Sequence, residues 1–353
     1  MTSAAAPCPQ LTPDELGEAL PAPQPDPRSL RWEPAVSLVH PKAEQLARSL
    51  DSGWNGTACS GVAELASRYF SSLEFQALNS GSYHNFDHPL VVAEAAGAFA
   101  SGLGWTPERK QFIQQVALLH DADDRSQVGG GDIKTGTPAR AQVTLEWMEQ
   151  QKDELSQRFG WSQVQFAEAR ALIARTDFPF DDVPKAPMGT RYDGKSSLQV
   201  YQELLQEVPQ ERRAEVMRDG LALRFADQAG FYANSFDMAV ESVQGLAQEL
   251  HSSLAGSLKF TPTFLAGVGK DTSFDHRLAA QLGLSGADLP DRDRLLASWT
   301  PAMAQRFRTN SSQFELMAQA VSSLPAESVE TQLDGLKMTA RSAYRLTTGQ
   351  IPT

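Results

Sequence analysis

Histidine and aspartate residues recur along this sequence at positions where they could bind a metal ion. His84 and His88 lie within one short stretch, the adjacent pair His120 and Asp121 follows, and Asp227 comes far downstream at the end of a mostly apolar run. Imidazole nitrogens and carboxylate oxygens are ligands that divalent first-row metals accept. An apolar helix tolerates a carboxylate only when a partner compensates for its burial, and a metal is a strong partner. The pattern therefore predicts a metal centre.

The predicted ligands are His88, His120, Asp121 and Asp227. One or two divalent ions held by them would polarise a phosphate ester and activate a water molecule. His and Asp ligands do not select between manganese, iron, magnesium and zinc. His84, four positions before His88, would remain a free imidazole beside the metal. We expect it to act as the general acid that protonates the leaving oxygen, the alternative being that it only orients a neighbour by a hydrogen bond.

Several charged residues could contact the phosphate of a substrate. Arg125, Lys134 and Arg140 lie close in sequence to the His-Asp pair, and Arg175 and Asp177 begin a loop rich in proline, aspartate and glycine. Arginine and lysine side chains are the usual partners of phosphate oxygens. Each of these residues could equally be an ordinary surface charge, and the loop could be a plain connection between helices.

The stretch 83–92, Tyr-His-Asn-Phe-Asp-His-Pro-Leu-Val-Val, resembles the opening motif of cyclic-nucleotide phosphodiesterases and related bacterial HD proteins. Together with the later His-Asp pair and the downstream aspartate, it makes the chain similar to the HD-domain metal-dependent phosphohydrolase superfamily. The resemblance covers roughly residues 80–235. It implies an all-helical HD core, His84 as leaving-group acid, and the same four metal ligands: His88, His120, Asp121 and Asp227.

The segment after the His-Asp pair departs from the known subfamilies. It reads Asp-Ala-Asp-Asp-Arg over residues 121–125, so it lacks the further histidine of the phosphodiesterases. Arg125 also replaces the last acidic residue of the motif that stringent-response hydrolases carry. The resemblance therefore indicates the superfamily, and it leaves the substrate and the number of metal ions open.

Helical periodicity dominates the sequence, and strand patterns are scarce. Thr106 and Pro107 predict a helix start, since threonine is a good N-cap and proline suits the first helical position. This helix should end at His120-Asp121. The other expected helices cover about 87–99, 137–147, 161–176, 197–208, 211–231 and 235–252. The fold class predicted is all-α, an HD-domain helical bundle with additional C-terminal helices.

Three regions are expected along the chain. Residues 1–35 are rich in proline and read as a disordered tail, residues 36–255 as the HD phosphohydrolase domain, and residues 256–353 as a helical C-terminal extension. The extension should pack on the HD domain or mediate a homodimer. Its sequence contains no motif of chemical interest.

Composition excludes several classes of protein. The 353 residues include 41% hydrophobic ones, which suits a globular protein, and carry a formal net charge of −12, which disfavours duplex nucleic acid as a partner. We expect no membrane partner, because no apolar run is long enough to span a bilayer. Without a visible secretory signal, and with only two cysteines, Cys8 and Cys59, the sequence predicts a cytoplasmic protein.

The function predicted from the sequence is a metal-dependent phosphohydrolase, an enzyme acting on a small phosphate ester such as a nucleotide, either a monoester or a diester. Metal-activated water would attack, and His84 would supply the proton. One alternative is a signalling or scaffold protein that keeps the HD fold without turnover. A di-iron HD oxygenase is less favoured, because such sites need more ligands than the sequence offers.

Overall fold

The computed structural model describes the chain over residues 83–84, 87–122, 141–187, 189–250, 252–270, 272–286 and 289–349. Within these ranges the regular structure consists of thirteen α-helices and short 3-10 turns, with no strand, so the predicted all-α class is confirmed. The predicted tail at 1–35, the start of the predicted HD domain and the expected helix start near residue 137 lie outside the described residues. Residues 80–353 form one unit.

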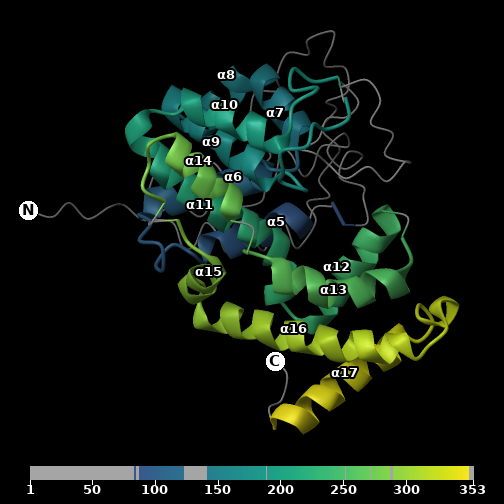
Figure 1. Ribbon diagram of the computed structural model, residues 1–353. Coiled ribbons are helices and arrows are strands. Elements are labelled where there is room, and N and C mark those ends of the chain that lie inside the picture. The colour runs from purple at the N-terminus through teal and green to yellow at the C-terminus, as the bar shows by residue number, and fades with distance from the viewer. Residues whose placement is uncertain are drawn as a thin grey trace, which may run out of the picture. The chain divides into compact units, whose positions relative to one another are not determined.

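The first half of the described chain supplies seven helices. They are α5 (Asp87–Gly97), α6 (Pro107–Leu119), α7 (Ala141–Gln150), α8 (Lys152–Phe159), α9 (Gln163–Thr176), α10 (Ser197–Glu207) and α11 (Gln210–Ala229). The second half begins with the 3-10 helix η2 (Phe231–Ala233). It continues with α12 (Phe236–Glu249), α13 (Leu254–Gly267), α14 (Ser273–Gln281), α15 (Arg292–Ser298), α16 (Pro301–Ser322), η4 (Ala326–Ser328) and α17 (Leu333–Thr348). Figure 1 shows their arrangement.

Local capping explains where the helices begin. The Thr106 side chain accepts a hydrogen bond from the Arg109 backbone, and Pro107 occupies the first helical position, so the predicted start of α6 is confirmed. Ser162 and Gln165 form a reciprocal capping box, which is why α9 begins at Gln163 rather than at the predicted Trp161. No element was expected between residues 147 and 161, where α8 lies.

Helices α6, α9 and α11 run in the same direction. Near their N-terminal ends, Arg109 of α6 and Arg212 of α11 both pair with Glu168 of α9. Further along, Arg224 of α11 donates a hydrogen bond of 2.7 Å to the carbonyl of Asp177, just past the end of α9. The C-terminal ends of the three helices therefore lie on one side of the bundle. Residues that follow those ends can meet there.

The helices beyond residue 255 pack directly on the earlier ones. The Trp299 ring stacks on Phe99, which follows the end of α5, with centroids 5.3 Å apart, and its indole N–H donates to the carbonyl of Ala95 of α5. The Asn310 amide on α16 donates to the carbonyls of Tyr232 and Asn234. Figure 1 shows α16 as a long helix beside α12 and α13, with α17 packed along it.

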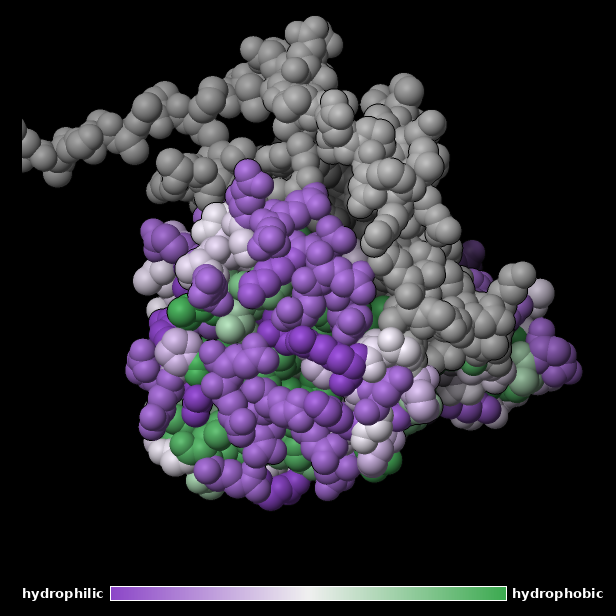
Figure 2. All heavy atoms as spheres, turned by 90° about the horizontal axis from the view of Figure 1, so that it is seen from above, coloured by the Kyte–Doolittle hydropathy of each residue, from purple (hydrophilic) through white to green (hydrophobic). Residues whose placement is uncertain are grey.

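Among the described residues that are coloured in Figure 2, hydrophilic side chains predominate, with smaller hydrophobic patches between them. The apolar side chains instead fill the interior, where Phe99, Ile113, Leu172 and Phe225 are buried. Among the helices of the described ranges, none has both the length and the apolar composition that crossing a bilayer requires.

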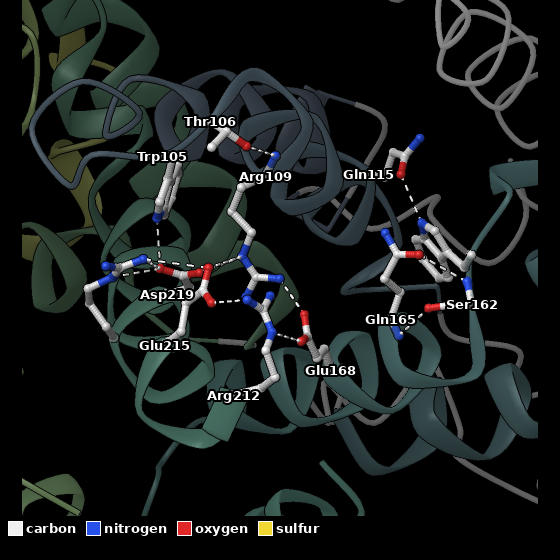
Figure 3. A network of polar contacts seen from close by, with 12 residues as sticks. Trp105, Thr106, Arg109, Gln115, Ser162, Gln165, Glu168, Arg212, Glu215 and Asp219 are labelled. Atoms are coloured by element: carbon white, nitrogen blue, oxygen red, sulfur yellow. Dashed lines mark hydrogen bonds and ion pairs between the residues drawn. The ribbon is translucent and has the colours of Figure 1, made fainter. Parts of the chain in front are cut away.

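A partly buried ion-pair network joins the N-terminal halves of α6, α9 and α11 (Figure 3). Asp219, with no exposed surface, accepts from the Arg109 Nε at 2.7 Å and from the Trp105 indole N–H at 2.7 Å. Glu168 accepts from Arg109 and from Arg212. We call this set the arginine network. Its members are Trp105, Arg109, Glu168, Arg212, Glu215, Arg218 and Asp219.

Candidate metal centre

Three helix ends supply the predicted metal ligands. His88 lies in the first turn of α5, and His120 is the C-cap of α6, with Asp121 next to it. Asp227 lies in the last turn of α11. Because α6 and α11 run in the same direction, their C-terminal ends bring these residues together. We call His88, His120, Asp121 and Asp227 the His/Asp cluster.

The side-chain atoms of the His/Asp cluster converge on one point. His88 Nε2 lies 3.0 Å from Asp121 Oδ2, 3.1 Å from Asp227 Oδ1 and 3.2 Å from His120 Nε2. His120 Nε2 lies 3.0 Å from Asp121 Oδ2 and 3.4 Å from Asp227 Oδ1. Both imidazoles are buried, and both carboxylates are nearly so.

These distances suit a shared cation. Ligand atoms about 2.0–2.2 Å from a metal in a tetrahedral or octahedral shell lie roughly 3.0–3.5 Å from one another. Asp121 Oδ2 is buried, and the Nε2 atoms of both histidines lie 3.0 Å from it. The four side chains thus point towards a common centre, and the donor set fits a divalent metal ion.

The orientation of the two imidazoles also fits this use. His120 Nδ1 donates to the carbonyl of Ala117 at 2.7 Å, which directs Nε2 towards the cluster. The His88 ring stacks on Phe231, with centroids 5.7 Å apart and planes 15° apart, and packs beside Tyr83. The His88 Nδ1 has no hydrogen-bond partner in the described part of the chain, so ring packing holds this imidazole in place.

Both carboxylates of the His/Asp cluster are ionised. Burial alone would raise the pKa of Asp121, but the charge of His120 and hydrogen bonds from His120 and His88 hold that pKa well below its usual range. For Asp227 the same hydrogen bonds outweigh burial and lower the pKa to about 2. Burial would lower the pKa of His120, yet the two carboxylates raise it well above its usual value. A cation bound at Nε2 would replace that proton.

His84 forms a partly buried pair with Glu249, the last residue of α12. His84 Nδ1 donates to Glu249 Oε1 at 2.5 Å, while Glu249 Oε2 accepts the backbone N–H groups of Tyr83 at 3.0 Å and of His84 at 3.1 Å. The metal-binding atoms of His84, His88 and Asp121 lie within 4.8 Å of one another. Glu249 therefore fixes His84 beside the His/Asp cluster.

The pair also keeps a proton on His84. Burial would lower the pKa of His84, but the hydrogen bond to Glu249 and the charges of Asp121, Glu249 and Asp227 raise it above 6.5. Burial would likewise raise the pKa of Glu249, and the hydrogen bond and charge of His84 lower it to about 2. The imidazolium form of His84 can thus donate a proton near neutral pH.

Glu249 was not predicted as a functional residue. It is one of many glutamates, it follows an ordinary amphipathic helix pattern, and its partner lies 165 residues earlier. Only the packing of α12 beside the segment that carries His84 brings the two side chains together. A search for acidic residues at the ends of helices downstream of Asp227 would have included it, among others.

Arg175 and Asp177 are the two expected substrate contacts that the structure describes. Arg175 has no exposed side-chain surface, pairs through two nitrogens with Asp275 of α14 at 2.7 and 2.8 Å, and lies over the Phe180 ring. Arg175 lies within the helix expected over 161–176 and is the last basic residue of the buried end of α9. It therefore holds α9 to α14 in this structure, and its expected contact with a substrate stays a prediction.

The remaining predicted contacts stay predictions. Asp177 is the buried C-cap of α9, and its backbone carbonyl accepts from Arg224. Arg125, Lys134 and Arg140 lie outside the described residues.

Comparisons of this chain with protein-family models, with curated proteins and with solved structures return no match. They therefore show no family for this chain, and the resemblance to HD-domain phosphohydrolases is one of sequence motifs alone. The fold contributes its all-helical class, and the site contributes its geometry.

Proposed function

We propose that this protein is a metal-dependent phosphohydrolase that acts on a small phosphate ester, either a monoester or a diester of the nucleotide type. The observation that supports this function best is the convergence of the four His/Asp cluster side chains, at 3.0–3.4 Å, beside the imidazole of His84. Cation ligands and a proton donor are the two components that ester hydrolysis requires.

The chain's own residues have distinct tasks in this proposal. A bound divalent cation, whether manganese, iron, magnesium or zinc, would polarise the phosphate oxygens and lower the pKa of a water molecule. The His/Asp cluster holds that cation through two nitrogens and two carboxylates. His84 donates its proton to the ester oxygen of the leaving group as the P–O bond breaks. Glu249 orients the His84 ring and keeps it protonated until that moment.

The number of ions and the acid role of His84 are linked. His84, His88 and Asp121 form a second set whose atoms lie close enough to hold a metal. A second ion on that set would take the ring nitrogen of His84 that Glu249 leaves free. One bound ion therefore suits general acid catalysis by His84, whereas two ions would require another proton donor.

The test is hydrolysis of a panel of phosphomonoesters and phosphodiesters, cyclic nucleotides included, in the presence of Mn²⁺. We expect turnover by the wild type and a loss of about a thousand-fold or more in Asp121→Ala, since metal activation contributes several kcal/mol to such reactions. The matched control is Asp334→Ala, because this aspartate on α17 is 91% exposed and should leave the rate unchanged.

Metal analysis of the same samples separates the other outcomes. Retained metal without turnover on any ester would contradict the proposal and favour a non-catalytic signalling or scaffold protein. Two iron atoms per chain together with oxygen consumption would favour an oxygenase. Equal turnover in wild type and Asp121→Ala would show that hydrolysis occurs elsewhere.

A further inference from the structure

The short helix η2 connects two helices that supply residues of the candidate site. It follows α11, which carries Asp227, and it leads into α12, whose last residue is Glu249. Its first residue, Phe231, stacks on the imidazole of His88. The placement of η2 therefore bears on three residues of the candidate site, although η2 itself supplies no metal ligand.

Among the three imidazoles of the candidate site, that of His88 is oriented in a different way. His120 and His84 each donate a hydrogen bond from Nδ1, one to a backbone carbonyl and the other to a carboxylate. Such a bond is what usually orients a histidine that ligates a metal. His88 Nδ1 is buried, and no described residue accepts a hydrogen bond from it. The orientation of His88 therefore depends on the rings of Phe231 and Tyr83 that pack against it.

Two side chains of the C-terminal extension bind the backbone of η2. Asn310 of α16 is buried, and its Nδ2 donates to the carbonyls of Tyr232 and of Asn234, both at 2.9 Å. Arg306, one turn earlier on α16, donates through Nε to the carbonyl of Ala233 at 3.0 Å. A helix of three residues leaves its carbonyl groups without partners inside the helix. Two side chains of α16 thus satisfy three consecutive carbonyl groups in and after η2.

The residue before η2 lies against α5, close to His88. A Cβ atom added at Gly230 would lie 2.6 Å from the Ala226 carbonyl oxygen, 3.2 Å from Val91 Cγ1 and 3.3 Å from Ala95 Cβ. A residue without a side chain permits this close approach. Val91 and Ala95 belong to α5, which carries His88 in its first turn. Contacts with α5 and with α16, all within five consecutive residues, therefore determine where the Phe231 ring lies.

We propose that Asn310 and Arg306 are positioning residues of the candidate metal centre, and that they act through η2 and Phe231 on the orientation of His88. This inference rests on the proposed function, because it concerns the metal centre of the same site. When the Phe231 ring is displaced, the His88 ring can turn and its Nε2 no longer points towards the other ligands. The C-terminal extension, whose sequence contains no motif of chemical interest, thereby contributes to the affinity for the cation.

The test is calorimetric titration of the metal-free full chain with Mn²⁺. Groups that orient a metal ligand typically change metal affinity by about 10–100-fold, so Phe231→Leu should weaken binding by about ten-fold. Phe231→Tyr keeps the stacking ring and should bind as the wild type does. Asn310→Leu and Arg306→Met remove the donors to η2 and act one step further away, so we expect a loss of about five-fold in each. Arg306→Met is the milder change, because this side chain is only half-buried.

The double variant Phe231→Leu/Asn310→Leu shows whether Asn310 acts through the Phe231 ring. If it does, the double variant should lose about ten-fold, no more than Phe231→Leu alone. Independent effects would multiply to about fifty-fold, because the free energies of independent sites add. A role of Asn310 in the stability of α16 alone would not produce this non-additivity.

The matched control is Thr309→Val. Thr309 is the neighbour of Asn310 on α16, is also buried, and has its hydroxyl 3.2 Å from that of Tyr344 on α17. Valine has a similar shape and breaks a buried hydrogen bond of the same helix, but on the side of α17. Thermal unfolding without metal should show a loss of stability, whereas the Mn²⁺ affinity of the folded chain should equal that of the wild type.

The inference is overturned if the wild type binds no Mn²⁺, if Phe231→Leu or both α16 variants bind it as tightly as the wild type, if the losses multiply in the double variant, or if Thr309→Val loses as much affinity as Asn310→Leu. These results differ from failure of the proposed function. Weaker Mn²⁺ binding in the variants, without hydrolysis of any ester by the wild type, would keep the positioning role and reject the phosphohydrolase. Hydrolysis by the wild type with unchanged affinity in the variants would do the reverse.

Discussion

The arginine network and the His/Asp cluster both contain residues of α6 and α11, but their charges are balanced in different ways. The N-terminal half of α6 supplies Arg109 and its C-cap is His120, while α11 supplies Asp219 and, two turns later, Asp227. In the arginine network every charged side chain pairs with an opposite charge of the same network. The His/Asp cluster brings carboxylates together with imidazoles, which carry no permanent charge.

Counting formal charges makes the difference explicit. The arginine network contains three guanidinium groups and three carboxylates, so the chain itself neutralises it; these are Arg109, Arg212, Arg218, Glu168, Glu215 and Asp219. The His/Asp cluster contains two ionised carboxylates, and its histidines are neutral whenever they ligate a metal. Buried charge that the chain balances supports the fold, and buried charge that it leaves for a cation supports binding.

The largest expected effect on stability comes from removing a carboxylate from the arginine network. Asp219→Ala leaves the Arg109 guanidinium buried without this carboxylate and the Trp105 N–H without its acceptor. Removing one partner of a buried ion pair typically costs about 3–5 kcal/mol of unfolding free energy. Denaturant unfolding measures this loss. The metal content per folded chain should not change, and a parallel loss of metal would contradict the separation of the two clusters.

The second effect concerns the His/Asp cluster, whose contribution to the free energy of unfolding should depend on added cation. Mn²⁺ at 100 times its dissociation constant should raise the unfolding free energy of the wild type by about 2.7 kcal/mol through mass action. Asp227→Asn keeps the size of the side chain but removes a charged ligand. It should abolish the metal-dependent shift in thermal unfolding, whereas Asp219→Asn should retain it. A shift of equal size in Asp227→Asn would place the metal elsewhere.

The smallest expected effect concerns the pair of His84 and Glu249, whose charge depends on pH. Glu249 raises the pKa of His84, so Glu249→Gln should lower it. The acid form of His84 is lost as the pH rises through that pKa, and the alkaline limb of the rate profile should therefore move to lower pH. General acid catalysis typically contributes 10²–10⁴-fold, so at neutral pH we expect about a ten-fold fall in kcat. An unshifted alkaline limb would mean that His84 is not the acid.

Sequence rules for helix capping predicted the helix ends that neighbouring residues determine. The start of α6 followed from Thr106 and Pro107, and its end from the polar pair at His120, because capping acts within a few residues. The four members of the His/Asp cluster were predicted from residue type and order, and the structure brings them together. Whether they bind a metal stays a prediction.

These local rules did not predict ion pairs between residues that are far apart in the sequence. The ion pair of Arg175 was not predicted because nothing near it in the sequence indicates Asp275, its partner a hundred positions later. Glu249 was missed for the same reason, since its role follows from the packing of α12 against the segment that carries His84. A salt bridge of this kind depends on tertiary structure alone, and its two residues have no characteristic spacing.

The shared direction of α6 and α11 has a consequence for the order of binding. Each helix end carries a partial charge of roughly half an electron, negative at the C-terminus. Two such negative ends, of α6 and α11, meet at the His/Asp cluster, against the single positive end of α5. Their potential adds to that of Asp121 and Asp227, so this point of the molecule favours a cation over an anionic phosphate. We therefore expect obligatory ordered kinetics, in which the cation enters first and the anionic ester second.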